Sequence, residues 1–273
     1  MIAHRLHRDE AMSLDQFGLD LEQNPRRAAR WIIHTASQGE IEAQALLGQI
    51  LLDGRGIGQD QSLALKWFAI AAARGHAMAC NMAGRCHEHG WGCPINFPLA
   101  CRYYQQGAVL GLDWAMYNLA NLVATGRGVL QDQAQAYALY HQAAELGHAK
   151  SMNLLGRYLE EGLVVPADSA AALDWYRRSA KAGDFRGQFS YAAVLITQQR
   201  WDEARHWLIE ALATGHLKFM RKARDELLTA RIESIADITM AYVSRCADIG
   251  EQGDRLLARK FAATRPGPLE IGA

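Results

Sequence analysis

The feature that most constrains this chain is an internal repeat with a period of 36 residues. Five positions recur with the same or a closely similar side chain in four consecutive units. They are Gly54, Gly90, Gly126 and Gly162; Asp60, Asn96, Asp132 and Asp168; Ala64, Ala100, Ala136 and Ala172; Phe68, Tyr104, Tyr140 and Tyr176; and Gly75, Gly111, Gly147 and Gly183. A fixed period of this length is typical of solenoid proteins, in which each unit buries its apolar face against its neighbours.

Each unit predicts two antiparallel helices. Apolar residues recur at helical spacing on both sides of a short glycine-containing loop, as Ala43, Leu47 and Leu51 before it and Ala64, Phe68 and Ala71 after it. Gly54 supplies the positive φ that ends the first helix, and Asp60 can accept hydrogen bonds from the N–H groups that open the second. The residues expected to cap the other second helices in this way are Asn24, Asn96, Asp132 and Asp168.

The repeated residues resemble the Sel1-like repeat, a longer-looped relative of the tetratricopeptide repeat. The pattern that carries the resemblance is A-x3-LG-x2-(Y)-x2-G-x-G-V-x2-D-x3-A-x2-WY-x2-A-A-x2-G. The resemblance implies an all-α fold, a right-handed superhelical αα-solenoid of Sel1-like, tetratricopeptide-like repeats. It also implies an adaptor or binding scaffold, and it offers no catalytic residues to carry over.

The repeat register divides the chain into units. Residues 1–10 have no apolar periodicity and are expected to be a flexible N-terminus, residues 11–250 to form a single solenoid domain, and residues 251–273 to hold a short helix and a flexible tail. The domain is read as a degenerate N-terminal unit at 11–39, repeats at 40–75, 76–111, 112–147 and 148–183, a shortened tetratricopeptide-like unit at 184–215, and a C-terminal cap at 217–250. Four basic residues are expected to solvate the outer face of this cap, namely Lys218, Arg221, Lys222 and Arg224.

Composition limits the classes of partner. The 29 basic and 29 acidic residues give a net charge of zero, which argues against a surface for nucleic acid or for anionic membranes. No apolar run approaches a membrane-spanning length, and the first residues lack the apolar core of a signal peptide. The five cysteines are an odd number and favour reduced thiols. We therefore expect a cytoplasmic protein that does not insert into membranes.

The densest group of metal-ligating residue types is Cys86, His87, Glu88 and His89, followed by Cys93. The repeat register favours packing instead, because His87 and Cys93 occupy positions that hold Leu, Ile or Val in the other units. Neither a phosphate-binding loop nor a nucleophile motif is found, so we expect no enzyme activity and no cofactor. The alternative that stays open is a protein that binds a small molecule or a metal, zinc or iron, through Cys86 and His89.

Three further histidines, His76, His148 and His216, follow the last glycine of a unit. Successive members of this set are two repeats apart and should lie about 20 Å or more from each other, so they cannot share one metal. We interpret them as solvated or capping side chains after a helix C-terminus.

The remaining signal lies at first-helix positions that the repeat pattern leaves variable, which line the concave surface of tetratricopeptide-like solenoids. The candidate binding residues there are Asn81, Arg85, Glu88, Trp114, Tyr117, Asn121, Asn153, Arg157, Glu160 and Phe189. The row near the start of each first helix contains Glu42, Met78, Trp114, Lys150 and Arg186.

An asparagine followed one helical turn later by an arginine occurs twice in this set, and these side chains suit backbone amides and carboxylates. The aromatic members offer surface to a partner's side chains. The arrangement resembles the lining with which some tetratricopeptide domains bind a C-terminal carboxylate, although the same residues could simply solvate a polar surface. Trp91, in an otherwise exposed loop, either marks a second contact or folds back onto its own repeat. We predict a non-catalytic adaptor that holds a peptide or protein segment, whose identity the sequence does not give, on the first-helix face.

Overall fold

The computed structural model describes residues 23–263. The expected flexible N-terminus at 1–10, the first helix of the degenerate unit and the flexible tail after residue 263 lie outside the described residues. The described part is all-α, with fourteen α-helices, one short 3-10 helix and no strand. No helix between residues 23 and 263 is both long enough and apolar enough to cross a membrane.

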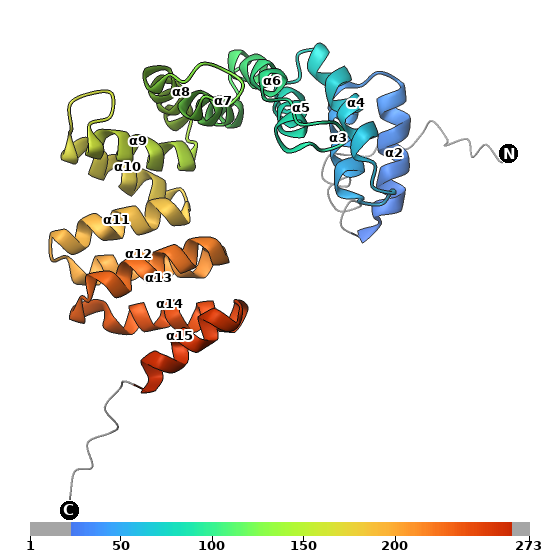
Figure 1. The fold of residues 1–273 in the computed structure, drawn as a ribbon. Helices are drawn as coiled ribbons and strands as arrows, with labels where there is room; N and C mark the ends of the chain where they lie inside the picture. The colour runs from blue at the N-terminus through green and yellow to red at the C-terminus, as the bar shows by residue number, and fades with distance from the viewer. Residues whose placement is uncertain (1–22, 264–273) are drawn as a thin grey trace, which may run out of the picture. The chain divides into compact units, whose positions relative to one another are not determined.

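The helices fall into two compact units that divide inside one helix, between Leu139 and Tyr140. Unit 1 comprises α2 (Pro25–Ser37), α3 (Ile41–Asp53), α4 (Gln61–Ala73), α5 (Ala77–His89), α6 (Phe97–Val109), α7 (Asp113–Thr125) and the first part of α8 (Gln133–Glu145) (Figure 1). Unit 2 comprises the rest of α8, then α9 (Ala149–Glu161), α10 (Ser169–Lys181), α11 (Phe185–Thr197), α12 (Trp201–Thr214), α13 (Leu217–Ala230), η1 (Glu233–Ile235), α14 (Ala236–Ile249) and α15 (Gln252–Ala263).

The predicted helix ends are confirmed in the repeats. Gly54 closes α3 in the left-handed conformation, with φ 71°, and the glycines at the same position close α5, α7 and α9 in the same way. Asp60 accepts a hydrogen bond from the Leu63 N–H at 2.8 Å, and Asn96, Asp132 and Asp168 cap their helices alike. The prediction for Asn24 is wrong: α2 has no side-chain cap, and its first turn is held by the Asn24 carbonyl, which accepts from the N–H groups of Arg27 and Ala28.

An aromatic ring from the second helix packs on a glycine of the first helix within each of three repeats. A Cβ added at Gly84 would lie 2.6 Å from the Tyr104 ring, and one at Gly156 would lie 2.6 Å from the Tyr176 ring. Gly48 faces Phe68 in the same way. The glycine is therefore required by the close approach of the two helices, and the ring fills the space that a side chain would take.

The three repeat-junction histidines cap the helix that follows them. The Nδ1 atom of His76 accepts a hydrogen bond from the Ala79 N–H at 3.0 Å, and His148 and His216 bind the third residue of α9 and α13 in the same way. Asp184 does this for α11 through its carboxylate, which accepts from the Gly187 N–H. The interpretation that places these histidines at the preceding helix C-terminus is wrong, because their rings act as hydrogen-bond acceptors at a helix N-terminus.

The C-terminal cap differs from its prediction in its arginines. Arg224 is buried and places Nη1 2.6 Å from Oδ1 of Asp254, and Arg221 places Nη2 2.7 Å from Oδ2 of the same carboxylate. These two arginines therefore fix α15 against α13 instead of solvating the outer face. The deletion expected in the fifth unit is seen as a three-residue link between α11 and α12.

Candidate binding face

First helices of neighbouring repeats contact each other within a unit, as α5 contacts α7 and α9 contacts α11. We therefore take the sides of α3, α5 and α7 in unit 1, and of α9, α11 and α13 in unit 2, as one face of each unit. We call it the first-helix face and describe it unit by unit. The second residue of every first helix forms one row along this face. The row holds Glu42, Met78 and Trp114 in unit 1 and Lys150, Arg186 and Lys218 in unit 2.

Asn81 is not on the surface, contrary to its selection as a binding residue. It is 3% exposed, and its Oδ1 accepts a hydrogen bond from Nδ2 of Asn118 on α7 at 2.8 Å. The amide of Asn81 is thus used to join two neighbouring first helices. The sequence alone does not reveal this contact, because the partner lies 37 positions further along the chain.

The two glutamates in the candidate set hold tyrosine hydroxyls of their own repeats. The Tyr104 hydroxyl donates to Oε2 of Glu88 at 2.7 Å, and the Tyr176 hydroxyl donates to Oε2 of Glu160 at 2.7 Å. Burial, followed by the glutamate partner, raises the pKa of both tyrosines, so their hydroxyls stay protonated and keep donating. Glu88 also pairs with Arg127 at 3.4 Å. Both glutamates therefore stabilise the repeat.

Arg85 and Trp91 form one cluster at the end of α5. The Arg85 guanidinium lies over the Trp91 ring, 4.9 Å from its centroid, and the His89 ring lies 4.9 Å from the same indole. Trp91 therefore folds back onto its own repeat, which is the second of the two readings of this residue. Arg85 remains partly exposed at the edge of the first-helix face.

The face in unit 1 exposes two large apolar side chains beside the exposed Glu42. Met78 and Trp114, at equivalent positions of α5 and α7, are 43% and 41% exposed. The Trp114 ring meets the half-buried Tyr117 ring edge-on, with centroids 6.4 Å apart. Asn121, one turn beyond Tyr117, is also half-buried. Large apolar side chains at this level of exposure do not contribute fully to the core and are available for contact.

The face in unit 2 is polar and basic. Arg157 is exposed and lies 3.8 Å from Glu161, one turn further along α9. Asn153 is half-buried, and its Oδ1 is enclosed with no hydrogen-bond partner among the described residues. Phe189 is half-buried against Phe219 of α13, with ring centroids 5.8 Å apart. Arg186 and Lys218 are exposed in the row defined above.

The alternative site at Cys86 and His89 has unfavourable chemistry for a metal. Cys86 is fully buried, and its burial raises the pKa of the thiol to about 12, so the thiolate that a metal needs is disfavoured. Cys93 lies against His87, with Sγ 3.3 Å from Nδ1. Within residues 23–263, no three side chains of His, Cys, Asp or Glu are grouped so that they could hold a metal ion.

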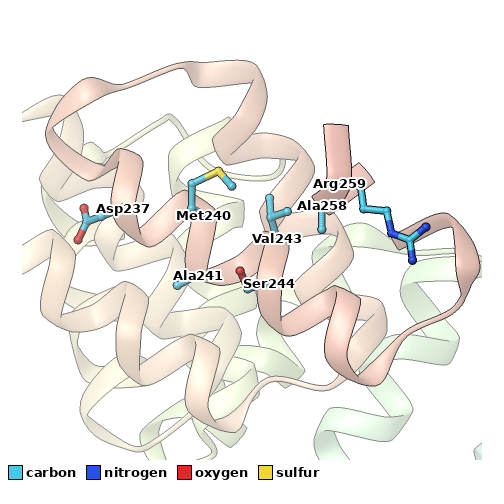
Figure 2. A pocket seen from close by; sticks show the side chains of 7 residues that line it. All are labelled: Asp237, Met240, Ala241, Val243, Ser244, Ala258 and Arg259. Atoms are coloured by element: carbon cyan, nitrogen blue, oxygen red, sulfur yellow. The ribbon is translucent and has the colours of Figure 1, made fainter. Parts of the chain in front are cut away.

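The structure also contains open pockets that the repeat pattern does not predict. Figure 2 shows one of them, a pocket of about 590 Å³ between α14 and α15. Its lining consists of Asp237, Met240, Ala241, Val243, Ser244, Ala258 and Arg259. The pocket lies beyond the last repeat, so no repeated position signals it.

Paired antiparallel helices, glycine-terminated first helices and capped second helices define the class of αα-solenoid repeat proteins. The sequence model of the Sel1 repeat family matches residues 12–40, 41–76, 77–112, 115–148 and 149–184. These residues are more than half of the chain. The chain belongs to the Sel1 repeat family. Proteins of this family generally mediate protein–protein interactions and typically are non-catalytic scaffolds.

Solved structures agree with this fold. The chain is similar to a Sel1 repeat protein from Oxalobacter formigenes, with 19% identity, a TM-score of 0.73, and coverage of 92% of this chain and 99% of that one. It is also similar to c5321, a protective antigen of uropathogenic Escherichia coli strains with the same repeat fold, with 24% identity and a TM-score of 0.68. That match covers 90% of this chain but only 55% of c5321, so the chain spans about half the length of that protein. No curated protein matches the chain.

Proposed function

We propose that this chain is a non-catalytic adaptor that holds a protein or peptide segment on the first-helix faces of its units. The observation that carries the proposal is the exposure of Met78 and Trp114 at equivalent positions of adjacent first helices. Trp, Tyr and Met are enriched at protein interfaces, where a few such side chains supply much of the binding free energy. The proposed contact residues are Met78, Arg85, Trp114, Tyr117 and Asn121 in unit 1 and Asn153, Arg157 and Phe189 in unit 2.

Three candidates from the sequence are not part of this proposal. The side chains of Asn81, Glu88 and Glu160 each make a hydrogen bond within the fold, at 2.7 or 2.8 Å. A partner that hydrogen-bonded one of these acceptors in place of Asn118, Tyr104 or Tyr176 would leave that buried or half-buried donor without its acceptor. The cost of the lost hydrogen bond opposes such binding. We further propose a cytoplasmic location, which is supported by the free state of all five cysteines.

Affinity capture with matched variants tests the proposal. The variant M78S/W114S removes the two apolar residues of the row in unit 1. The variant V109S/L130S removes two other exposed apolar residues, 82% and 87% exposed, from the end of α6 and from a loop. Wild type and V109S/L130S should retain the same host protein from a lysate, and M78S/W114S should retain it at least about tenfold less. Thermal melting should be similar for all three proteins. Retention that is equal for the two variants would contradict the proposal.

A further inference from the structure

The row at the start of the first helices is basic throughout unit 2. Lys150, Arg186 and Lys218 are each the second residue of their helix, α9, α11 and α13. The three helices are neighbours: Lys150 of α9 acts electrostatically on Asp184 at the start of α11, and Nη2 of Arg186 lies 3.3 Å from Nε2 of His216 at the start of α13. The three cations therefore follow one another along one edge of the unit.

This position is unfavourable for a cation. The first turn of a helix carries partial positive charge and is stabilised by acidic side chains, and unit 1 places Glu42 and Asp113 in the first turns of α3 and α7. A basic residue there weakens its own helix. Lys150 and Arg186 also favour the ionised form of the buried Asp184 carboxylate. The helix dipole itself does not explain why three successive first helices of unit 2 carry a basic residue here.

Two further basic side chains lie on α10, the helix that packs against both α9 and α11. Lys181 is exposed at the end of α10, and Arg178 nearby lies over the Trp175 ring at 3.8 Å. Glu145 pairs with Arg178 at 3.8 Å, and the buried Asp184 is held by the Gly187 N–H.

We infer that this basic row binds an acidic segment of a protein partner, a conclusion that rests on the proposed adaptor function and specifies the chemistry of its ligand. Neighbouring helices lie about 8–10 Å apart, and an extended peptide advances about 3.3 Å per residue. The row therefore matches an extended segment with an acidic residue at every third position. A nucleic-acid surface is less favoured, because it requires a basic excess and the chain has a net charge of zero.

Fluorescence anisotropy with two labelled peptides tests this on the full chain. One peptide carries glutamate at every third position of a Gly/Ser sequence, and the other has the same composition with its glutamates adjacent. The row variant is K150Q/R186Q/K218Q, and the control R102Q/R177Q/R245Q removes three exposed arginines outside the row. Glutamine is used because glutamate at Lys150 and Arg186 would add negative charge beside the buried Asp184.

The spaced peptide should bind wild type and control equally and the row variant at least about tenfold more weakly, with affinity falling as salt is raised from about 20 to about 200 mM. The adjacent-glutamate peptide should bind wild type more weakly than the spaced one. Equal binding to wild type and row variant, no binding to wild type, or no preference for the spaced peptide would overturn the inference. Tighter, row-dependent binding of a single-stranded oligothymidine would overturn it in favour of nucleic acid. K218Q alone, at the exposed end of the row, should show a smaller loss in the same direction and serves if the triple variant does not fold.

This test is separate from the test of the adaptor function. The capture experiment depends on Met78 and Trp114 in unit 1, whereas the peptide experiment depends on residues of unit 2. Protein capture that needs Trp114, together with failed peptide binding, refutes the acidic ligand and leaves the adaptor function supported. Failure of the capture experiment alone refutes the proposed contact at Met78 and Trp114, whatever the peptides do.

Discussion

Met78 and Trp114 in unit 1 occupy the same repeat position as Lys150 and Arg186 in unit 2, yet one pair is apolar and the other basic. The helices that carry them are alike, since each has the same length and begins and ends at equivalent positions. The repeat pattern therefore determines where the helices begin and end, and it leaves the side chains of this row variable. Side-chain chemistry in the row therefore reports on partners more directly than on folding.

The largest expected effect concerns a feature of unit 2, the ionic contact that closes its C-terminal cap. D254A removes a buried carboxylate that contacts Arg221 and Arg224, and leaves the buried Arg224 guanidinium with only Asp225. We expect unit 2 to lose about 3 kcal/mol of stability. Hydrogen exchange should become faster in α13 to α15 and stay unchanged in α3 to α6. D248A, at an exposed aspartate of α14, is the control and should leave both regions as they are.

The same contact predicts a pH dependence confined to unit 2. Hydrogen bonds from Arg221, and then from Arg224, lower the pKa of Asp254 well below its ordinary value. The ionised carboxylate therefore stabilises the folded state above the unfolded pKa of about 3.9, and this contribution is lost as pH falls through the lower folded pKa. The stability difference between wild type and D254A should be constant from pH 7 to about pH 5 and shrink on further acidification. A difference that instead grows below pH 4 would contradict this assignment.

The next prediction tests whether the same glycine–tyrosine contact stabilises the helix pairs of both units. G84A and G156A each place a methyl group 2.6 Å from a tyrosine ring, Tyr104 in unit 1 and Tyr176 in unit 2. Both variants should lose about 1–3 kcal/mol in denaturant unfolding, and by similar amounts. G58A is the control, because a Cβ at Gly58 meets nothing within 4 Å. If G84A melts like G58A, the ring does not set the helix approach.

Asn81 in unit 1 and Asn153 in unit 2 occupy the same repeat position. Replacing them should change the free energy of unfolding in opposite directions and by less than the changes above. N81L removes the acceptor of the Asn118 side-chain amide and should cost about 1–2 kcal/mol. N153L replaces an amide whose enclosed Oδ1 has no partner among the described residues, and should be neutral or stabilising. Thermal unfolding of the two single variants compares them directly. N118L is the control for the first, and a double variant N81L/N118L that recovers part of the loss would confirm that the pair acts together.

The fold could be predicted from the sequence because its determinants are local to one repeat. Gly54, Asp60 and Phe68 each act within a few residues or on the paired helix, and the period repeats that information. The binding residues were harder to predict from the sequence, because the side chain that hydrogen-bonds Asn81 belongs to the next repeat. A partial signal existed for the glutamates: Glu88 and Glu160 occur with tyrosine sixteen residues later and Leu52 occurs with Phe68, but Ala124 also occurs with a tyrosine, Tyr140.

The junction histidines show a different limit. His76 follows a glycine that ends one helix and precedes the first turn of the next, so the sequence allows it to be assigned to either helix. The assignment depends on which backbone N–H group its ring reaches, and this follows from the path of the chain after Gly75. Asp184 at the equivalent position was the informative residue, since aspartate is a common N-cap and is rarely a C-terminal one.

The smallest expected effect separates stability from binding in the row itself. K218E places an acid in the first turn of α13, where it should raise stability by about 0.5 kcal/mol. E42K places a base in the first turn of α3 and also removes the contact of Glu42 with His76, so it should lower stability by at least a similar amount. K66E, an exposed charge reversal in the middle of α4, is the control and should change stability by less than either. Thermal unfolding at low salt measures all three, and the spaced acidic peptide is titrated against the same samples.

K218E should therefore be more stable than wild type and bind the acidic peptide more weakly. This combination is expected only if the lysine is kept for a ligand at some cost to its helix, because a residue kept for folding would lose stability when its charge is reversed. Destabilisation by K218E would show that the basic row belongs to the frame of unit 2. The contrast with Met78 and Trp114 would then reflect two ways of starting a helix, and the two faces would no longer indicate different ligand chemistry.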